Sequence, residues 1–379
     1  MFDRHICLPG RKSHISRMGI ILIYEYVINA TSATSSNYVF NLRRRMHVYH
    51  SFGIFFLLSL LFTPGIATKF ASKDVAIITT VPYKLDTYYA GEEFFDGWEF
   101  FNNSDPTHGY VQYISQKEAQ LMGIIDTNPA YIGVDRWNYY DPLGNGRKSV
   151  RITTKKSWTR GLFIADLLHV PKSVCGVWPA IWSFGPQWPN NGEIDFFEGV
   201  NRNRHNIVSL HSGKNCTMNF GQQLGTERSP ACHISASSQG CGVKANSSLT
   251  YGEDMNDIRG GVYAMEWTSN HIKVWFFPRR EIPHDITLGL PLPDKWGLPL
   301  AYFLDSDKCG IDLNFKNHSL VIDTTFCGDW AGGKFNSDEV CSSRGTCAEW
   351  VAYNPIAFKD VYWEMKSIAV YQQSEESCE

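Results

Sequence analysis

Three acidic residues lie close together in the segment Glu193-Ile-Asp-Phe-Phe-Glu198. On a regular β-strand the side chains alternate between two faces, so Glu193 and Asp195 share one face, whereas Glu198, five residues after Glu193, points to the other. The adjacent pair Phe196 and Phe197 interrupts this alternation. A β-bulge that absorbs one of them would return Glu198 to the face of the other two acids and direct both rings to the core. The sequence therefore predicts a bulge and three carboxylates on one face.

Crowded carboxylates on one face destabilise a sheet unless their charge is used. A solvated acidic edge strand and a calcium site are the alternatives, but the apolar neighbours indicate a packed strand, and calcium loops use turns and backbone carbonyls. Paired carboxylates are typical of glycosidic bond cleavage, in which one protonates the leaving oxygen and the other attacks the anomeric carbon. We expect Glu193 to be the nucleophile and Glu198 the acid, with a pKa raised by the charge of Glu193. Asp195 would hydrogen-bond the nucleophile.

Alternating apolar and polar residues predict the strands that position these acids. They lie at 149–154, 162–167, 207–211, 262–267, 272–277, 320–326 and 361–371. The polar cluster at 268–271 separates two of them and predicts a hairpin. No long apolar period of 3.6 residues occurs in the body of the chain. We therefore expect an all-β fold, most simply a double-sheet sandwich or jelly roll formed by one domain over residues 68–379.

The composition narrows the class of protein. Of 379 residues, 19% are charged and 14% are aromatic, which is typical of a folded protein rather than a disordered one. The formal net charge is -3 at pH 7, so no overall positive field attracts nucleic acid. The 12 tryptophans can stack on sugar rings or fill a core, and composition does not distinguish these two uses.

The ten cysteines indicate an oxidising compartment. Cys7 stands far upstream, and nine others lie in the body of the chain. Without paired CxxC elements, no metal site is predicted. Cys378, next to the C-terminus, is the expected unpaired cysteine.

Residues 46–67 are typical of a secretory signal peptide. Arginines at 43–45 precede Met46, an apolar run covers 52–62, and small residues allow cleavage after Ala67. The apolar run is shorter than the roughly 20 residues of a membrane span, and an uncleaved signal anchor is the alternative. Residues 1–45 are then a gene-model extension or a disordered leader. Four glycosylation sequons agree with a secreted, extracellular or cell-wall protein: Asn102, Asn215, Asn246 and Asn317.

Several further blocks of the sequence resemble one family. They are Asp105-Pro-Thr-His-Gly-Tyr110, Arg147-Lys-Ser-Val-Arg151, Cys175-Gly-Val-Trp-Pro-Ala-Ile-Trp182, Trp188-Pro-Asn-Asn-Gly192, Leu210-His-Ser-Gly213, Lys273-Val-Trp-Phe-Phe-Pro278 and Phe326-Cys-Gly-Asp-Trp-Ala-Gly332. With the motif Glu-x-Asp-x-x-Glu at 193–198, they are similar to glycoside hydrolase family 16, specifically fungal-type laminarinases and endo-1,3(4)-β-glucanases. The resemblance extends from about residue 85 to the C-terminal strand. It implies a concanavalin-like β-jelly roll sandwich with a cleft on the concave sheet.

The resemblance also implies roles for residues outside the acidic motif. At matching positions, Trp182, Trp188, His211 and Trp330 would line the cleft and bind substrate. A tryptophan in a β-protein is more often part of the core, and we place Trp178 and Trp275 on the core side. The eight body cysteines other than Cys378 match the family's cysteine positions, which implies four disulfides without naming the pairs.

The expected function is a retaining endo-β-glucanase that acts on β-1,3 or mixed β-1,3/β-1,4 glucans without a cofactor. We expect it to act as a monomer on β-glucan, without nucleic acid and without stable membrane insertion. A cell-wall glucan transglycosylase, in which a second glucan replaces water, is an alternative that the sequence leaves open. A non-catalytic β-glucan-binding protein on the same fold would have no need of the intact acids.

Overall fold

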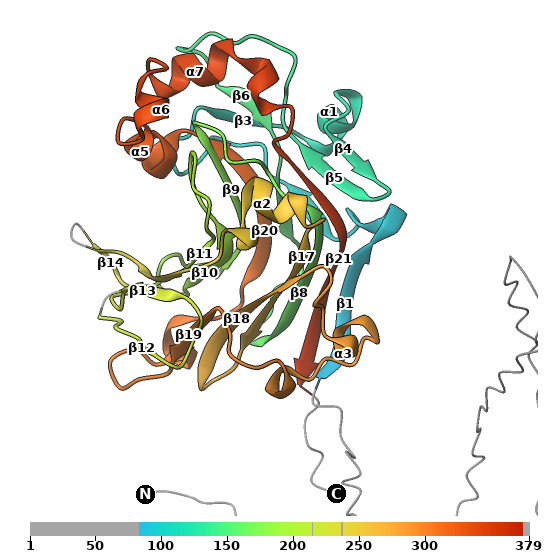
Figure 1. Ribbon diagram of the computed structural model, residues 1–379, viewed down its shortest axis with the longest axis vertical. Coiled ribbons are helices and arrows are strands. Elements are labelled where there is room, and N and C mark those ends of the chain that lie inside the picture. The colour runs from blue at the N-terminus through green and yellow to red at the C-terminus, as the bar shows by residue number, and fades with distance from the viewer. Residues whose placement is uncertain (1–82, 214, 236–237, 374–379) are drawn as a thin grey trace, which may run out of the picture. The chain divides into compact units, whose positions relative to one another are not determined.

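Two antiparallel β-sheets packed face to face form the body of the protein (Figure 1). The computed structural model describes residues 83–213, 215–235 and 238–373, and these residues belong to one compact unit. The predicted leader (1–45), the predicted signal peptide (46–67) and Cys378 lie outside the described residues. Within the described part, no helix combines the length and the apolar character needed to cross a bilayer.

One sheet has nine strands. In spatial order they are β12 (Asn219–Phe220), β19 (Ala301–Leu304), β18 (His271–Pro278), β17 (Gly261–Trp267), β8 (Gly161–His169), β21 (Tyr362–Gln373), β5 (Ala130–Gly133) and β4 (Ile125–Thr127), with β1 (Tyr83–Ala90) also paired to β21. The predicted hairpin is confirmed, because β17 and β18 pair from Gly261 and Pro278 down to Trp267 and Ile272.

The other sheet has eight strands and carries the acidic motif at its centre. In spatial order they are β13 (Thr226–Ser229), β16 (Cys241–Lys244), β11 (Ile207–His211), β10 (Glu193–Glu198), β9 (Val177–Phe184), β20 (Ser319–Phe326), β7 (Arg151–Thr154) and β2 (Trp98–Phe100). Two small sheets pair β3 (Val111–Tyr113) with β6 (Arg147–Ser149) and β14 (Ile234–Ser235) with β15 (Ser238–Gln239). Each stretch with a predicted period of two overlaps a strand, so the all-β prediction is confirmed.

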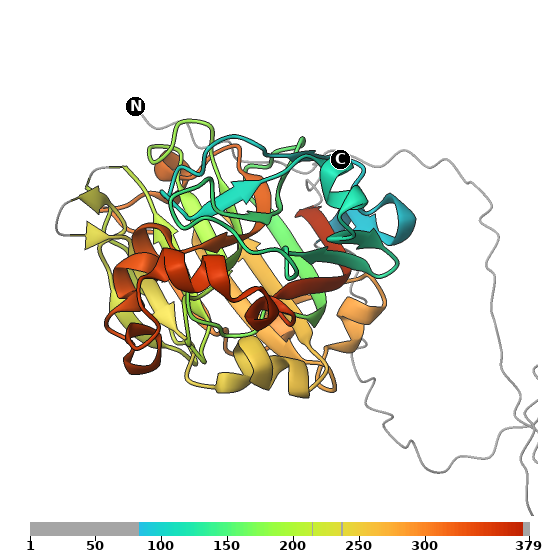
Figure 2. The same cartoon turned by 90° about the horizontal axis from the view of Figure 1, so that it is seen from above.

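The helices in the described part are short. They are α1 (Gln116–Leu121), α2 (Gly252–Asp257), α3 (His284–Thr287), α4 (Ile311–Asn314), α5 (Gly333–Phe335), α6 (Glu339–Ser342) and α7 (Cys347–Tyr353), with helical turns η1 (Gly91–Glu93), η2 (Ser248–Thr250), η3 (Pro293–Lys295), η4 (Gly328–Gly332) and η5 (Pro355–Phe358). Helices α5 to α7 gather at one end of the sheets (Figures 1 and 2). Thr346 and Glu349 form a capping box that starts α7.

The main core lies between the two sheets, where alternate residues of each strand point inward. Its fully buried side chains include Phe163 and Met265 from one sheet and Phe197 and Leu210 from the other. A second apolar cluster covers the outer face of the nine-stranded sheet, where Trp275 packs edge-on against Trp296. Trp275, which we placed on the core side, is buried, but in this outer cluster and not in the core between the sheets.

Four disulfides join the eight cysteines between positions 175 and 347. The pairs are Cys175–Cys341, Cys216–Cys309, Cys232–Cys241 and Cys327–Cys347. The predicted number of bridges is confirmed, and the structure supplies the pairing. Two of the bridges attach the segment of α5 to α7 to the eight-stranded sheet, because Cys175 precedes β9 and Cys327 follows β20.

Candidate active site

The strand register places the three acids on one face of the eight-stranded sheet. The pairing of β10 with β9 shifts between Asp195 and Phe197, which is the predicted bulge. After the shift, the residue of β9 that pairs with Glu198 lies on the same face as the residues of β9 that pair with Glu193 and Asp195. These partners are every second residue of β9: Phe184, Trp182 and Ala180. The bulge prediction is confirmed.

The two phenylalanines at the bulge both enter the core, as predicted. Phe196 and Phe197 are fully buried between the sheets. The ring of Phe197 stacks on Tyr251 at a centroid distance of 5.0 Å and meets Trp363 edge-on. Burial of both rings therefore favours the irregular strand, because a regular strand would direct one of them to the polar face.

Glu198 is buried and hydrogen-bonded at both carboxylate oxygens. Ser209 on β11 donates its hydroxyl to Oε1 at 2.6 Å, and the indole N–H of Trp178 lies 3.4 Å from Oε2. Burial raises the pKa of Glu198, and the charge of Glu193 raises it further, whereas the Ser209 hydrogen bond and the charge of His211 lower it. The expected direction is found, but burial is the main cause and the charge of Glu193 is a smaller one.

Asp195 is the most deeply buried of the three acids. Burial raises its pKa well above the ordinary value, followed by the charges of Glu193 and Glu198 and a hydrogen bond with Glu193. These surroundings favour the protonated form of Asp195 over the charged one. His211 Nε2 lies 3.1 Å from Asp195 Oδ2 and 3.8 Å from Glu193 Oε1. The shorter contact lacks hydrogen-bond geometry, since Oδ2 has no hydrogen-bond partner among the described residues.

Glu193 is the most accessible of the three acids, with a side chain that is 17% exposed. Trp188, which is 51% exposed in the loop between β9 and β10, donates its indole N–H to Glu193 Oε2. This contact places Trp188 at the acids, as predicted, with much of its ring accessible to solvent. A partly exposed carboxylate with donors around it has the environment that a nucleophile requires.

Trp182 lies on the same face and contacts two charged residues that the sequence interpretation missed. Its indole N–H is 3.4 Å from Asp323 Oδ1 on β20, and the guanidinium of Arg151 on β7 lies 4.9 Å from its ring centroid. Burial raises the pKa of Asp323 to about 7, although Arg151 opposes the rise. The sequence did contain a signal for them, because Arg151 and Asp323 are charged residues inside the predicted strands 149–154 and 320–326.

One tryptophan prediction is wrong. We expected Trp178 on the core side, but it is only partly buried, lies on the face of the acids and meets Trp330 edge-on at 5.5 Å. The reason is the period of the strand, because Trp178 and Trp182 are four residues apart on β9 and therefore share a face. Trp330, on η4, thus joins the site through Trp178.

Carboxylate and imidazole donors at this site also raise the question of a metal ion. Donor atoms of Glu193, Asp195 and His211 all lie within 4.8 Å of one another. Trp188 already donates its indole N–H to Glu193, and three donors are far fewer than the 6–8 oxygens around calcium. The donor set of these three residues therefore does not match a calcium site.

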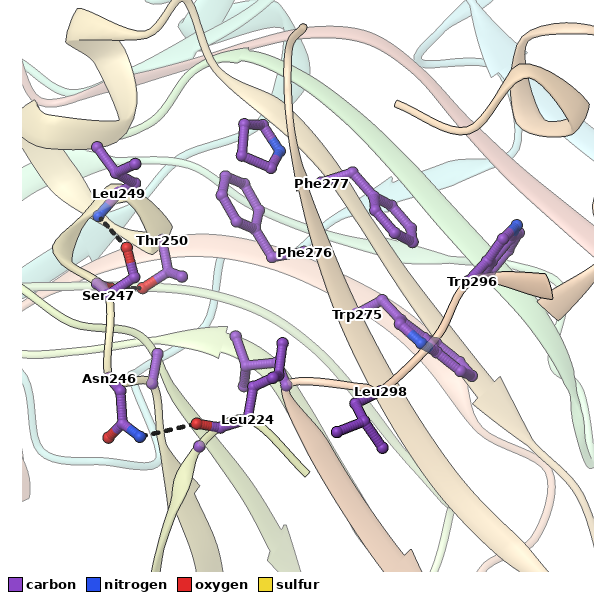
Figure 3. A pocket seen from close by; sticks show the side chains of 14 residues that line it. Leu224, Asn246, Ser247, Leu249, Thr250, Trp275, Phe276, Phe277, Trp296 and Leu298 are labelled. Atoms are coloured by element: carbon purple, nitrogen blue, oxygen red, sulfur yellow. Dashed lines mark hydrogen bonds between the residues drawn. The ribbon is translucent and has the colours of Figure 1, made fainter. Parts of the chain in front are cut away.

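The larger of the two described grooves lies away from these acids. It has a volume of about 340 Å³ and is lined by β18 and by segments at 224–225, 245–250 and 296–300 (Figure 3). The cleft expected on the face of the acids remains a prediction.

One family model and several known proteins are similar to this chain. A family model described as an XgeA-like, catalytic GH16 domain matches residues 98–371. A "Probable endo-1,3(4)-beta-glucanase" of Neosartorya fischeri is 43% identical over 300 residues, which cover 76% of this chain and 46% of that protein. The endo-1,3(4)-beta-glucanase xgeA of Emericella nidulans is 40% identical over 300 residues, covering 76% and 47%. The chain thus spans about half the length of these curated relatives.

Two solved structures share the fold at high sequence identity. Laminarinase 16A from Phanerochaete chrysosporium, with β-glucans in its donor and acceptor sites, is 37% identical with a TM-score of 0.73, covering 76% of this chain and 99% of that one. An elongating GH family 16 β-1,3-glucosyltransferase is 40% identical with a TM-score of 0.71, covering 76% and 100%. The jelly-roll sandwich predicted from the sequence is therefore confirmed.

Proposed function

Because the chain belongs to glycoside hydrolase family 16, in its XgeA-like group, we propose that it is a retaining endo-β-glucanase that cleaves β-1,3 or mixed β-1,3/β-1,4 glucans. One observation carries this proposal: the bulge in β10 returns Glu198 to the face that bears Glu193 and Asp195. A retaining mechanism requires two carboxyls that flank the scissile bond and are separated by about 5–5.5 Å, which two long acidic side chains on one face of the sheet can provide. A non-catalytic glucan-binding protein would not require this arrangement.

The environments of the acids support a division of roles. Asp195 holds a proton and donates it in a hydrogen bond to Glu193, which leaves negative charge on the more accessible Glu193. Glu193 then attacks the anomeric carbon while Glu198, kept protonated by burial, gives its proton to the leaving oxygen. When the sugar esterifies Glu193, that negative charge is lost. The pKa of Glu198 then falls, and Glu198 can act as the base that activates water.

Aromatic side chains on both sides of the acids are suited to sugar rings. Trp188 and Trp182 lie near Glu193 and Asp195, whereas Trp178 and Trp330 lie near Glu198. We propose that the first pair binds the sugars that remain on the enzyme and that the second pair binds the leaving chain. No cofactor has a role in this mechanism.

Glucan transfer is the second candidate function. The elongating β-1,3-glucosyltransferase that is 40% identical to this chain supports it, and a laminarinase 16A mutant that cyclizes laminariheptaose is 36% identical. Retention makes both outcomes chemically available, since either water or a sugar hydroxyl can attack the glycosyl–enzyme intermediate. Labelled laminari-oligosaccharide acceptors distinguish them, because transfer yields labelled products longer than the acceptor.

The location of the protein remains a proposal. We propose that the chain is secreted and acts as a monomer on extracellular or cell-wall glucan. The four disulfides support an oxidising compartment. Detection of the protein in the medium or wall fraction, with an N-terminus that follows Ala67, is the expected result, whereas retention in membranes would indicate the signal anchor.

The mechanism is tested by replacing each acid with alanine and adding azide. With an aryl β-laminaribioside as substrate, Glu193→Ala should form the α-glycosyl azide, because azide attacks in place of the missing carboxylate. Glu198→Ala should form the β-azide, because azide opens the ester on Glu193. Both variants should lose hydrolysis of laminarin and keep the circular dichroism of the wild type. Retained laminarin turnover in either purified variant would refute the assignment.

A further inference from the structure

Asn206 connects the two sides of the bulge in β10. Its amide N–H donates to the carbonyl of Phe196 at 2.9 Å, and its amide oxygen accepts from the backbone N–H of Glu198 at 2.8 Å. Asn206 lies directly before β11 and is fully buried. We propose that Asn206 is a positioning residue that holds the carboxyl of Glu198 on the face of the other acids. This inference rests on the proposed glucan hydrolysis.

The side chain of Asn206 replaces backbone pairing that the bulge removes. Strand β11 pairs with β10 at Glu193, Ile194 and Asp195, and the pairing ends there. The Phe196 carbonyl and the Glu198 N–H lie beyond this point and are buried. Leaving either buried group without a hydrogen-bond partner would destabilise the fold. One amide satisfies both, because it offers a donor and an acceptor on the same planar group.

Asn206 is itself held from two directions. Its backbone N–H donates to Thr250 Oγ1 at 3.2 Å, and its carbonyl accepts from the Ala245 N–H at 2.9 Å. Without the amide side chain, the two orphaned groups could be satisfied by continuing the regular pairing with β11. That change would remove the bulge and turn Glu198 away from Glu193. The position of the acid therefore depends on this amide.

The test compares two leaving groups in Asn206→Ala. For laminarin, which needs protonation of the leaving oxygen, kcat/KM should fall about 100-fold, because general acid catalysis contributes roughly 10²–10⁴. For 2,4-dinitrophenyl β-laminaribioside, whose dinitrophenolate leaves without being protonated, kcat/KM should fall much less. Asn206→Asp keeps an acceptor at this position and should give an intermediate loss on laminarin.

A matched control separates positioning from general destabilisation. The side-chain amide of Asn256, on α2, makes the same kind of paired hydrogen bonds: it accepts from the backbone N–H of Val170 and donates to its carbonyl, each at 2.9 Å, directly after β8 of the other sheet. Asn256→Ala should lower the melting temperature without changing the ratio of the two substrates. Equal losses on both substrates in Asn206→Ala would overturn the inference. A wild-type protein inactive on both would instead refute the proposed function.

A second, independent observation concerns the groove of Figure 3. Leu224, Leu249 and Leu298 at this groove are 61%, 39% and 50% exposed, which is unusual for leucines gathered on one surface. Asn246, at the rim, is the acceptor of the sequon Asn246-Ser-Ser248. We infer that Asn246 carries an N-linked glycan whose first sugars cover the groove. This inference rests on secretion.

The orientation of Asn246 supports this occupant. Its Oδ1 accepts from Thr226 Oγ1 at 2.7 Å, and its Nδ2, the atom that would bear the sugar, donates to the Leu224 carbonyl at 2.7 Å (Figure 3). An amide nitrogen has two hydrogens, so one can be replaced by sugar while the other keeps this bond. The glycan would therefore start beside Leu224, with Leu298 and Trp275 next along the groove.

Protein secreted from a eukaryotic host provides the test. Peptide mass spectrometry should find Asn246 glycosylated, and Asn246→Gln should gain fluorescence with the dye 8-anilinonaphthalene-1-sulfonate, because the leucines become accessible. Ser248→Thr keeps the sequon and should not gain it, and neither should Asn102→Gln. An unmodified Asn246, or equal dye binding by Asn246→Gln and the wild type, would overturn the inference.

Discussion

Ser209, directly opposite Asp195 on β11, donates a hydrogen bond from its hydroxyl to Glu198 Oε1, with 2.6 Å between the two oxygens. The bond favours the charged form of Glu198 and lowers its pKa, against burial, which raises it. The proton affinity of the proposed acid is therefore a balance between two sheet features. One is the burial of the Glu198 carboxyl, and the other is the hydroxyl of Ser209 on the neighbouring strand.

Replacing Ser209 with alanine should move the pH profile in a defined direction. Without the hydroxyl, the charged form of Glu198 loses a donor, so its pKa rises further above the ordinary value. The acid then stays protonated to higher pH. The alkaline limb of kcat/KM on laminarin should shift to higher pH in Ser209→Ala.

Ser183 is the matched control for Ser209. It is also buried, on β9, but its hydroxyl contacts His318 on the opposite face of the sheet. Ser183→Ala should leave the alkaline limb unchanged. A shift to lower pH in Ser209→Ala would contradict the proposed role of Glu198 as the acid.

Trp188→Phe tests the donor on the proposed nucleophile. Phenylalanine keeps an aromatic face for sugar stacking but has no N–H for Glu193 Oε2. A hydrogen bond to a charged group contributes roughly 1.5–3 kcal/mol, so kcat/KM on laminarin should fall about tenfold or more. Trp137 is similarly exposed, at 50%, and Trp137→Phe should have no effect. Equal activity of Trp188→Phe and the wild type would show that the contact does not contribute.

Gly240→Ala should disturb His211 without touching the acids. Gly240 has φ +101°, and a Cβ there would lie 2.4 Å from His211 Nδ1. The imidazole must move, and its Nε2 then leaves Asp195 and Glu193. We expect a large loss of kcat with laminarin.

The control for Gly240 is Gly297, which has φ +74° with no atom within 4 Å of a built Cβ. Gly297→Ala introduces backbone strain of roughly 1–2 kcal/mol at an uncrowded position, so it should lower stability and keep kcat. If the two variants lose activity equally, the contact of Gly240 with His211 is not the cause.

Glu266 should make stability depend on acidic pH. Burial acts to raise its pKa, but hydrogen bonds from His271 and Tyr83 and the charges of His271 and Lys273 lower it overall below the ordinary 4.5. A lowered folded-state pKa stabilises the fold above the unfolded value, and this stabilisation is lost as the pH falls through the folded value. The free energy of unfolding in urea should therefore fall less steeply with acidification in Glu266→Gln than in the wild type.

The acidic site was largely predictable because its signal is local. Two adjacent phenylalanines conflict with a period of two over six residues, and burial of both rings resolves the conflict only through a bulge. The hairpin around 268–271 was predictable for the same reason, since the turn and both strands are contiguous. The period of β9 could also have placed Trp178 beside Trp182, a step that the interpretation of Trp178 as a core residue overlooked.

The sequence by itself determined the chemical groups and their shared face, because the side-chain period of a strand depends only on neighbours along the chain. The tertiary structure decided which distant groups surround the acids. Arg151 and Asp323 reach the site through strand pairing between segments far apart in sequence. Asn206 and Ser209 are only 8 and 11 residues from Glu198, but the register of β11 on β10 decides that they contact it. It also decided that burial, more than the charge of Glu193, raises the pKa of Glu198, because desolvation depends on what packs over a residue and not on its position in the chain.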